Sequence, residues 1–168
     1  MYKLLLSPAG RIGRQRFWIG IAVFTVLVVV FNFMLRQMGN SVWAFLISLP
    51  FPFIALHMTY SIYGKRLHDM GRSFWPLTGM IALLILVAIV VMLSFGGSEY
   101  FAEFSQYERK EDIDPAILAE IQERYQTRLA QGNATVSAVM YGIIGAFTLW
   151  CGFSKSDPNT NNYGAPTA

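Results

Sequence analysis

The sequence predicts an all-α polytopic membrane protein with four transmembrane helices and an extramembrane amphipathic helix between the third and the fourth. Two observations support this fold class. Hydrophobic residues make up 54% of the 168 residues, charged residues only 14%, and the mean hydropathy is +0.42, whereas soluble domains carry about 25% charged residues. The apolar residues also gather into four runs of about 18 to 21 residues, the length that spans a bilayer. We expect one membrane domain over residues 1–168.

The first apolar run covers residues 17–35 and follows a basic segment, residues 1–16, that contains no acidic residue. A signal peptide has the same order of charge and apolarity. This run is too long for one, however, and no small-residue cleavage site follows it. We therefore expect a retained first transmembrane helix.

The second run, residues 42–62, contains Pro50 and Pro52 near its middle. Two prolines remove two backbone donors, so we expect a kink or a break in this helix. Beyond them, helical spacing places four residues on one face as a polar seam directed at the bundle interior: His57, Ser61, Gly64 and His68. His57 is the intramembrane polar candidate, either as a proton relay or as a packing histidine satisfied by one hydrogen bond.

The third run, residues 75–95, holds no ionisable group. Residues 98–133 then form an acidic insert, with eight acidic and four basic residues. In this insert Asp114 and Pro115 are typical of a helix start and Gly132 of a helix end. Apolar residues recur between them at helical spacing, which predicts an amphipathic helix outside the membrane.

The fourth run, residues 136–153, is at the short end of what can span a bilayer. It contains the single cysteine, Cys151, which we expect to be a small buried hydrophobe. One cysteine excludes an intramolecular disulfide framework and a thiolate metal cluster. Residues 154–168 are rich in Asn, Pro, Ser and Thr, and we expect an irregular cytoplasmic tail.

Four spans place both termini on the same side of the membrane. Short loops on that side carry four basic residues before the first run and three in residues 65–75, whereas Arg36 is alone between the first two runs. Because basic residues concentrate in cytoplasmic loops, we expect cytoplasmic termini and an acidic insert on the opposite side.

Three short motifs bracket these spans: GRIGRQRFW at residues 10–18, KRLHDMGRSFW at residues 65–75 and NNYG at residues 161–164. Together they resemble the bacterial domain-of-unknown-function family 805. The resemblance implies a small multi-pass protein of the bacterial inner (plasma) membrane, and it implies no activity. The acidic insert departs from the compact members of that family, so no role for the insert follows from the resemblance.

The hinge, residues 65–75, is the candidate functional element. Asp69 can pair with Lys65 or Arg66 one turn before it, and Gly71 can adopt the positive φ that ends a helix. One interpretation is ordinary anchoring of helix ends at the membrane surface. The other is a binding site for an anionic group such as a phospholipid head group, because arginine suits phosphate. Its residues would be Arg11, Arg14, Arg66, His68, Asp69 and Arg72.

These features favour a non-enzymatic membrane protein that binds lipids or a partner, either another membrane protein or a second copy of itself. His68 and Asp69 are neighbours on a helix and do not face each other, so we expect no enzyme and no cofactor. Two histidines with one nearby acid predict no metal site, and the charge pattern does not imply nucleic acid. The alternative is an oligomeric small-solute or proton-coupled transporter or channel, because broken helices build transporter binding sites.

Overall fold

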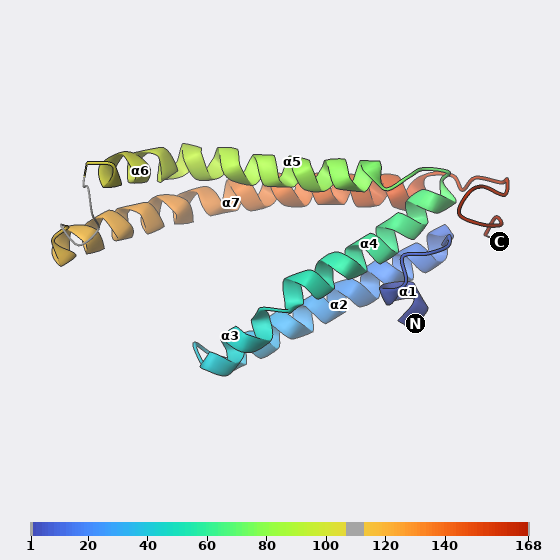
Figure 1. Cartoon of the computed structure of the whole chain (residues 1–168), viewed down its shortest axis with the longest axis horizontal. Helices are drawn as coiled ribbons and strands as arrows, with labels where there is room; N and C mark the ends of the chain where they lie inside the picture. Colours follow the sequence, from blue (N-terminus) through green and yellow to red (C-terminus); the bar gives the residue numbers. More distant parts are fainter. Residues whose placement is uncertain (1, 107–112, 168) are drawn as a thin grey trace. The chain divides into compact units, whose positions relative to one another are not determined.

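The computed structural model describes residues 2–106 and 113–167, and within these ranges the chain is helical with irregular connections and no strand. The chain divides into two compact units. The first unit comprises Met1–Thr78 and Thr148–Ala168, and the second unit comprises Gly79–Phe147. Figure 1 colours the helices along the sequence.

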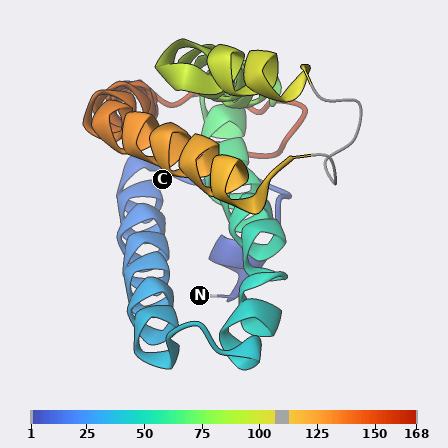
Figure 2. The same ribbon diagram turned by 90° about the vertical axis from the view of Figure 1, so that its left-hand side faces the viewer.

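The first unit is built on an antiparallel pair of helices, α2 (Arg14–Met38) and α4 (Phe51–Asp69), which are connected through the short helix α3 (Val42–Ser48) (Figure 2). A fourth helix, α1 (Tyr2–Leu6), packs against α4 and also contacts α2. The core of this unit consists of side chains with no exposed surface, among them Phe17, Ile62, Leu67, Leu77 and Cys151.

The break predicted at the two prolines is confirmed. Helix α3 ends at Ser48 and α4 begins at Phe51, because Pro50 and Pro52 cannot donate the backbone hydrogen bonds that would continue one helix. The Ser41 side chain caps α3 by accepting a hydrogen bond from the backbone N–H of Ala44 at 3.2 Å.

The second unit contains most of α5 (Trp75–Met92), a π-helical turn η1 (Leu93–Gly97), α6 (Ser98–Phe104) and most of α7 (Pro115–Phe153). Helices α6 and α7 contact each other through aromatic rings. The ring centroids of Tyr100, on α6, and Tyr125, on α7, are 4.6 Å apart.

The start of α7 was predicted correctly and its expected end was not. Asp114 precedes the helix, and its Oδ1 accepts a hydrogen bond from the backbone N–H of Ala116 at 2.8 Å. The helix does not end at Gly132 but continues to Phe153. A glycine inside a helix lowers helix stability by only about 1 kcal/mol relative to alanine. The helix-forming residues of the fourth apolar run follow shortly after Gly132, so the helix continues. The helix predicted to start at Asp114 and Pro115 is therefore the beginning of the fourth apolar helix, while residues 98–104 of the insert form α6. Residues 107–112 of the insert lie outside the described residues.

In the described part of the chain, four stretches are long and apolar enough to cross a membrane: Arg14–Met38, Val42–Asp69, Trp75–Phe95 and Val136–Phe153. Their apolar side chains are largely exposed; Val29 on α2, for example, keeps 61% of its surface accessible, and Phe53 on α4 keeps 77%. Exposed apolar surface on this scale would be unfavourable in water and is what a lipid environment covers. The predicted all-α, four-span fold class is confirmed.

Candidate functional site

The hinge ends α4 with a Schellman turn. Gly71 has a positive φ of 71°, its N–H donates to the carbonyl of His68 at 3.1 Å, and the next N–H, that of Arg72, donates to Leu67 at 2.8 Å. Only glycine adopts this backbone conformation without strain. The turn stops the helix directly after Asp69 and so fixes the direction in which the Asp69 carboxylate points.

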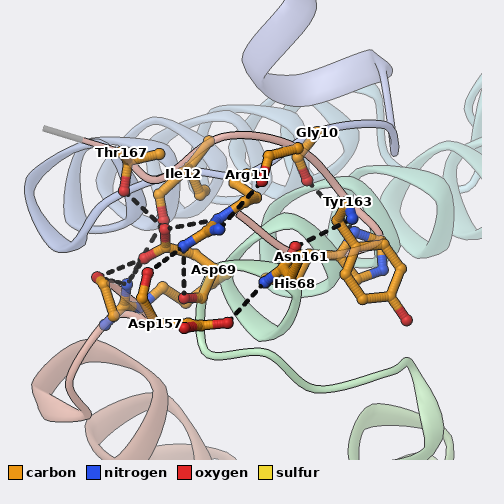
Figure 3. A network of polar contacts seen from close by, with 12 residues as sticks. Gly10, Arg11, Ile12, His68, Asp69, Asp157, Asn161, Tyr163 and Thr167 are labelled. Carbon is orange, nitrogen blue, oxygen red and sulfur yellow. Dashed lines mark hydrogen bonds and ion pairs between the residues drawn. The ribbon is translucent and has the colours of Figure 1, made fainter. Parts of the chain in front are cut away.

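The Asp69 carboxylate is the centre of a buried polar cluster (Figure 3). It has no exposed surface and accepts ion-paired hydrogen bonds from Arg66, one turn before it, and from Nε of Arg11 at 3.3 Å. The hydroxyls of Ser156 and Thr167 donate to it at 2.5 and 2.6 Å. Lys65 takes no part in this pairing, so of the two partners predicted for Asp69 the structure selects Arg66.

The two buried arginines donate most of their remaining N–H groups to backbone carbonyls of the end of α7 and the tail. Arg66 is fully buried and donates to Cys151 at 2.8 Å and to Ser154 at 2.5 Å. Arg11, 9% exposed, donates to three tail carbonyls at 2.5 to 3.2 Å, those of Asp157, Asn159 and Gly164. A guanidinium has five N–H donors, so little of either group is left for an external anion.

The tail is irregular, as expected, but it is ordered by contacts with the hinge. The Tyr163 ring stacks on the His68 ring at 3.7 Å with an interplanar angle of 3°. The Asn161 side chain donates to the His68 carbonyl at 3.1 Å, and the Asp157 N–H donates to the Asp69 carbonyl at 2.7 Å. Sequence reasoning missed this role of the tail, for which the NNYG motif was the only signal.

Arg14 and Arg72 lie outside the cluster. Both are exposed. Arg14 Nε donates to the carbonyl of Ser154 at 3.0 Å, and the Arg72 guanidinium lies 5.2 Å from the ring centre of Trp150 in a cation–π contact. The structure therefore brings four of the six predicted site residues together, Arg11, Arg66, His68 and Asp69, and leaves the other two at the surface.

His57 has a single described partner, the N-terminal helix. Its Nε2–H donates to the carbonyl of Leu6 at 2.7 Å. Two turns further along α4, the Lys65 ammonium donates to the carbonyls of Lys3 at 2.6 Å and Leu4 at 2.7 Å. Both side chains thus satisfy carbonyls at the end of α1 that lack helical partners. The N-terminal segment folds back along α4, which its basic composition did not predict.

A pocket of about 380 Å³ lies between α1, the start of α2 and Lys65. Its walls combine cationic and apolar side chains, provided by Lys3, Leu4, Ala9, Arg11, Ile12, Arg16, Ile19 and Lys65. None of these described lining residues is acidic. Of the residues predicted for an anion site, only Arg11 borders this pocket.

No group of three or more His, Cys, Asp or Glu side chains in the described residues is placed to hold a metal ion. The Cys151 thiol is buried, as predicted for a core residue.

The chain is mostly helical, has four helices long and apolar enough to cross a membrane, and carries a charged cluster at the end of α4. This is the architecture of a small polytopic membrane protein. The chain belongs to a family described as "Protein of unknown function (DUF805)", whose model matches residues 5–165. This range includes all three sequence motifs and every residue of the cluster around Asp69 except Thr167. No curated protein and no solved structure matches the chain.

Proposed function

We propose that this protein is a non-enzymatic protein of the bacterial inner membrane that binds anionic lipid head groups at its cytoplasmic end. The observation that carries the proposal is a surplus of cations. The first unit contains only two acidic residues, Asp69 and Asp157, and nine basic residues. Eight of these belong to the N-terminal segment, the hinge and the tail: Lys3, Arg11, Arg14, Arg16, Lys65, Arg66, Arg72 and Lys155.

The buried cluster divides these cations into two groups with different roles. Three are committed to contacts within the protein: Arg11 and Arg66 bind Asp69 and backbone carbonyls, and Lys65 binds the carbonyls of α1. These three position the helix ends and the tail. Five others are exposed and free of an acidic neighbour in the described contacts: Lys3, Arg14, Arg16, Arg72 and Lys155. The binding surface is therefore this exposed basic rim, and the hinge is its rigid support.

An exposed basic rim suits the surface of an anionic leaflet. Each Lys or Arg near such a surface contributes about 1 kcal/mol to attraction. The neighbouring tryptophans support an interfacial position, since Trp75, at the start of α5, keeps 78% of its surface exposed and tryptophan concentrates at membrane interfaces. With the termini in the cytoplasm, the basic rim faces the leaflet that carries these lipids.

Transport is the alternative function, and the break between α3 and α4 is the observation in its favour. A substrate pathway would need the broken segment to border a cavity. The pocket near this break is lined by residues of α2, α3 and their connection, and neither proline nor His57 lines it. Lipid binding is therefore the function that the geometry supports better.

Lipid retention in nanodiscs tests the proposal. We expect protein reconstituted in an equal mixture of phosphatidylcholine and phosphatidylglycerol to keep phosphatidylglycerol preferentially when bulk lipid is stripped, as measured by mass spectrometry. Replacing Arg14, Arg72 and Lys155 with Gln should lower this preference by about fivefold per charge removed. Arg36→Gln, at the other end of α2, is the control and should leave it unchanged. Equal retention of the two lipids by the wild type would overturn the proposal.

A further inference from the structure

We infer that the pocket between α1, α2 and α4 is a specific site for one phosphate-bearing lipid, with the head group at Lys3 and Arg16 and an acyl chain along Ile19. This inference rests on the proposed function and goes further, because it assigns a single stoichiometric site within a surface that otherwise attracts anionic lipids by charge alone.

The charges of the pocket select an anion. Four of the eight described residues that line it are cationic. Two are already engaged, Arg11 in the buried cluster and Lys65 with the carbonyls of α1. An ammonium group has three donors, so Lys65 keeps one of them. Lys3 and Arg16 are exposed, and neither side chain has a hydrogen bond or ion pair to any other described residue.

The apolar wall distinguishes a lipid from a free phosphate. Leu4 and Ile12 line the pocket, and Ile19 extends this wall on α2, where it keeps 46% of its surface exposed. Ile19 belongs to the first stretch long and apolar enough to cross a membrane, Arg14–Met38. A soluble anion would leave this wall uncovered, whereas a lipid would cover it while its phosphate meets the cations.

The dimensions agree with a head group rather than a whole lipid. Ligand pockets usually enclose about 300 to 1,000 Å³, and this pocket encloses about 380 Å³. It therefore accommodates a phosphorylated head group and the first methylenes, with the rest of the chain lying outside along α2. Helix α1 forms one side of the site, and Lys65 and His57 hold that helix in place.

Native mass spectrometry with matched charge variants tests the site. In nanodiscs of equal phosphatidylcholine and phosphatidylglycerol, we expect the wild type to keep one phosphatidylglycerol per chain. Lys3→Gln with Arg16→Gln should weaken that binding about 30-fold, because two contacts of about 1 kcal/mol each are lost. Arg14→Gln with Lys155→Gln removes the same charge from the basic rim outside the pocket, so it should lower the general preference for phosphatidylglycerol and still keep the single adduct. Both pairs replace exposed side chains, so unchanged helical circular dichroism and unfolding midpoints serve as the folding control.

Competition separates the two sources of phosphate. A soluble short-chain phosphatidylglycerol should displace the retained lipid, and inorganic phosphate at the same concentration should not, because only the former covers Ile19. Equal displacement by both would overturn the acyl contact. Equal loss of the adduct in both double variants would overturn the specific site and leave the general proposal standing. A wild type with neither an adduct nor any preference for phosphatidylglycerol would overturn both.

Discussion

Each unit of this protein contains an arginine–carboxylate ion pair, and the two pairs occupy opposite environments. In the first unit, Arg66 and Asp69 have no exposed side-chain surface. In the second unit, Arg124 and Glu103 pair at 3.1 Å with 53% and 36% of their side chains exposed. The residue chemistry is nearly the same. The two pairs differ in whether water can solvate the charge that remains when one side chain of the pair is removed.

The consequence of this difference is structural. The buried pair collects donors from segments far apart in the chain, since Arg11 and Thr167 both reach the Asp69 carboxylate. The exposed pair joins only α6 to α7, with Glu120 one turn away as a second partner of Arg124 at 3.8 Å. We therefore expect the first pair to determine whether the unit folds and the second to contribute little.

The largest effect is predicted for Asp69→Asn. The substitution keeps the shape of the side chain and removes the carboxylate that, among the described residues, pairs with the buried Arg11 and Arg66. Breaking a buried pair leaves an uncompensated charge and costs about 3–5 kcal/mol. The free energy of unfolding of the reconstituted protein, measured by circular dichroism in mixed micelles with increasing sodium dodecyl sulfate, should fall by that amount.

The matched control for Asp69→Asn is Glu103→Gln at the exposed pair. We expect it to lower the free energy of unfolding by about 0.2–1 kcal/mol, because exposed pairs contribute little, and added salt should abolish even this difference. If the two substitutions cost the same, burial does not separate the two pairs and the comparison fails.

A smaller effect is predicted for Gly71→Ala, which tests the turn that aims the Asp69 carboxylate. An L-residue at a φ of 71° is strained, and a Cβ there would lie 3.2 Å from Oδ2 of Asp157. We expect a loss of about 1–2 kcal/mol in the free energy of unfolding.

Gly142→Ala is the corresponding control on α7, where a Cβ meets no atom within 4 Å. Because alanine favours a helix over glycine, this change should be neutral or stabilise by about 0.5–1 kcal/mol. A Gly71→Ala protein as stable as the wild type would show that the turn does not depend on glycine.

The sequence was sufficient for features governed by local spacing. Apolar runs predicted the four spans, Pro50 and Pro52 predicted the break, and the spacing of Arg66 and Asp69 allowed their pairing within one helical turn. Gly71 predicted the turn because the ability to adopt a positive φ without strain is a property of glycine itself. Gly132 led to a wrong prediction of the helix end, because a single glycine does not end a helix when helix-forming residues follow it.

Features governed by long-range contacts could not be predicted. Arg11 lies 58 residues from Asp69 along the chain, and Thr167 lies 98 residues from it. No periodicity relates residues at such separations, so the sequence predicted one site for all the arginines and an irregular tail without contacts to the hinge. Helix α1 was missed because a five-residue helix is too short to show a periodic pattern.

The smallest predicted effect is an acid dependence confined to the tail. The Asp157 carboxylate accepts hydrogen bonds from the backbone N–H of Asn159 at 3.0 Å and from the Asn161 side chain at 3.1 Å. These bonds, the first being the larger cause, hold the pKa of Asp157 below its ordinary value of 3.8. A carboxyl group with a lowered pKa in the folded state contributes stability above pH 3.8, and this contribution is lost as the pH falls through the lower folded value.

The backbone amides of Asn161 and Gly164 donate to each other's carbonyls. Hydrogen exchange, corrected for intrinsic rates, should therefore show constant protection of these two amides as the pH is lowered to about the ordinary pKa of aspartate. Protection should then decline at lower pH in the wild type. Asp157→Asn should show lower protection with no such decline, while the amides of α4 keep theirs in both proteins. If the wild type and the variant give the same profile, another group holds the tail. The tail would then be held by its contacts with Asp69, Arg11 and Arg66, and the contrast between a cluster joined from three segments and a local surface pair would rest on those buried ion pairs.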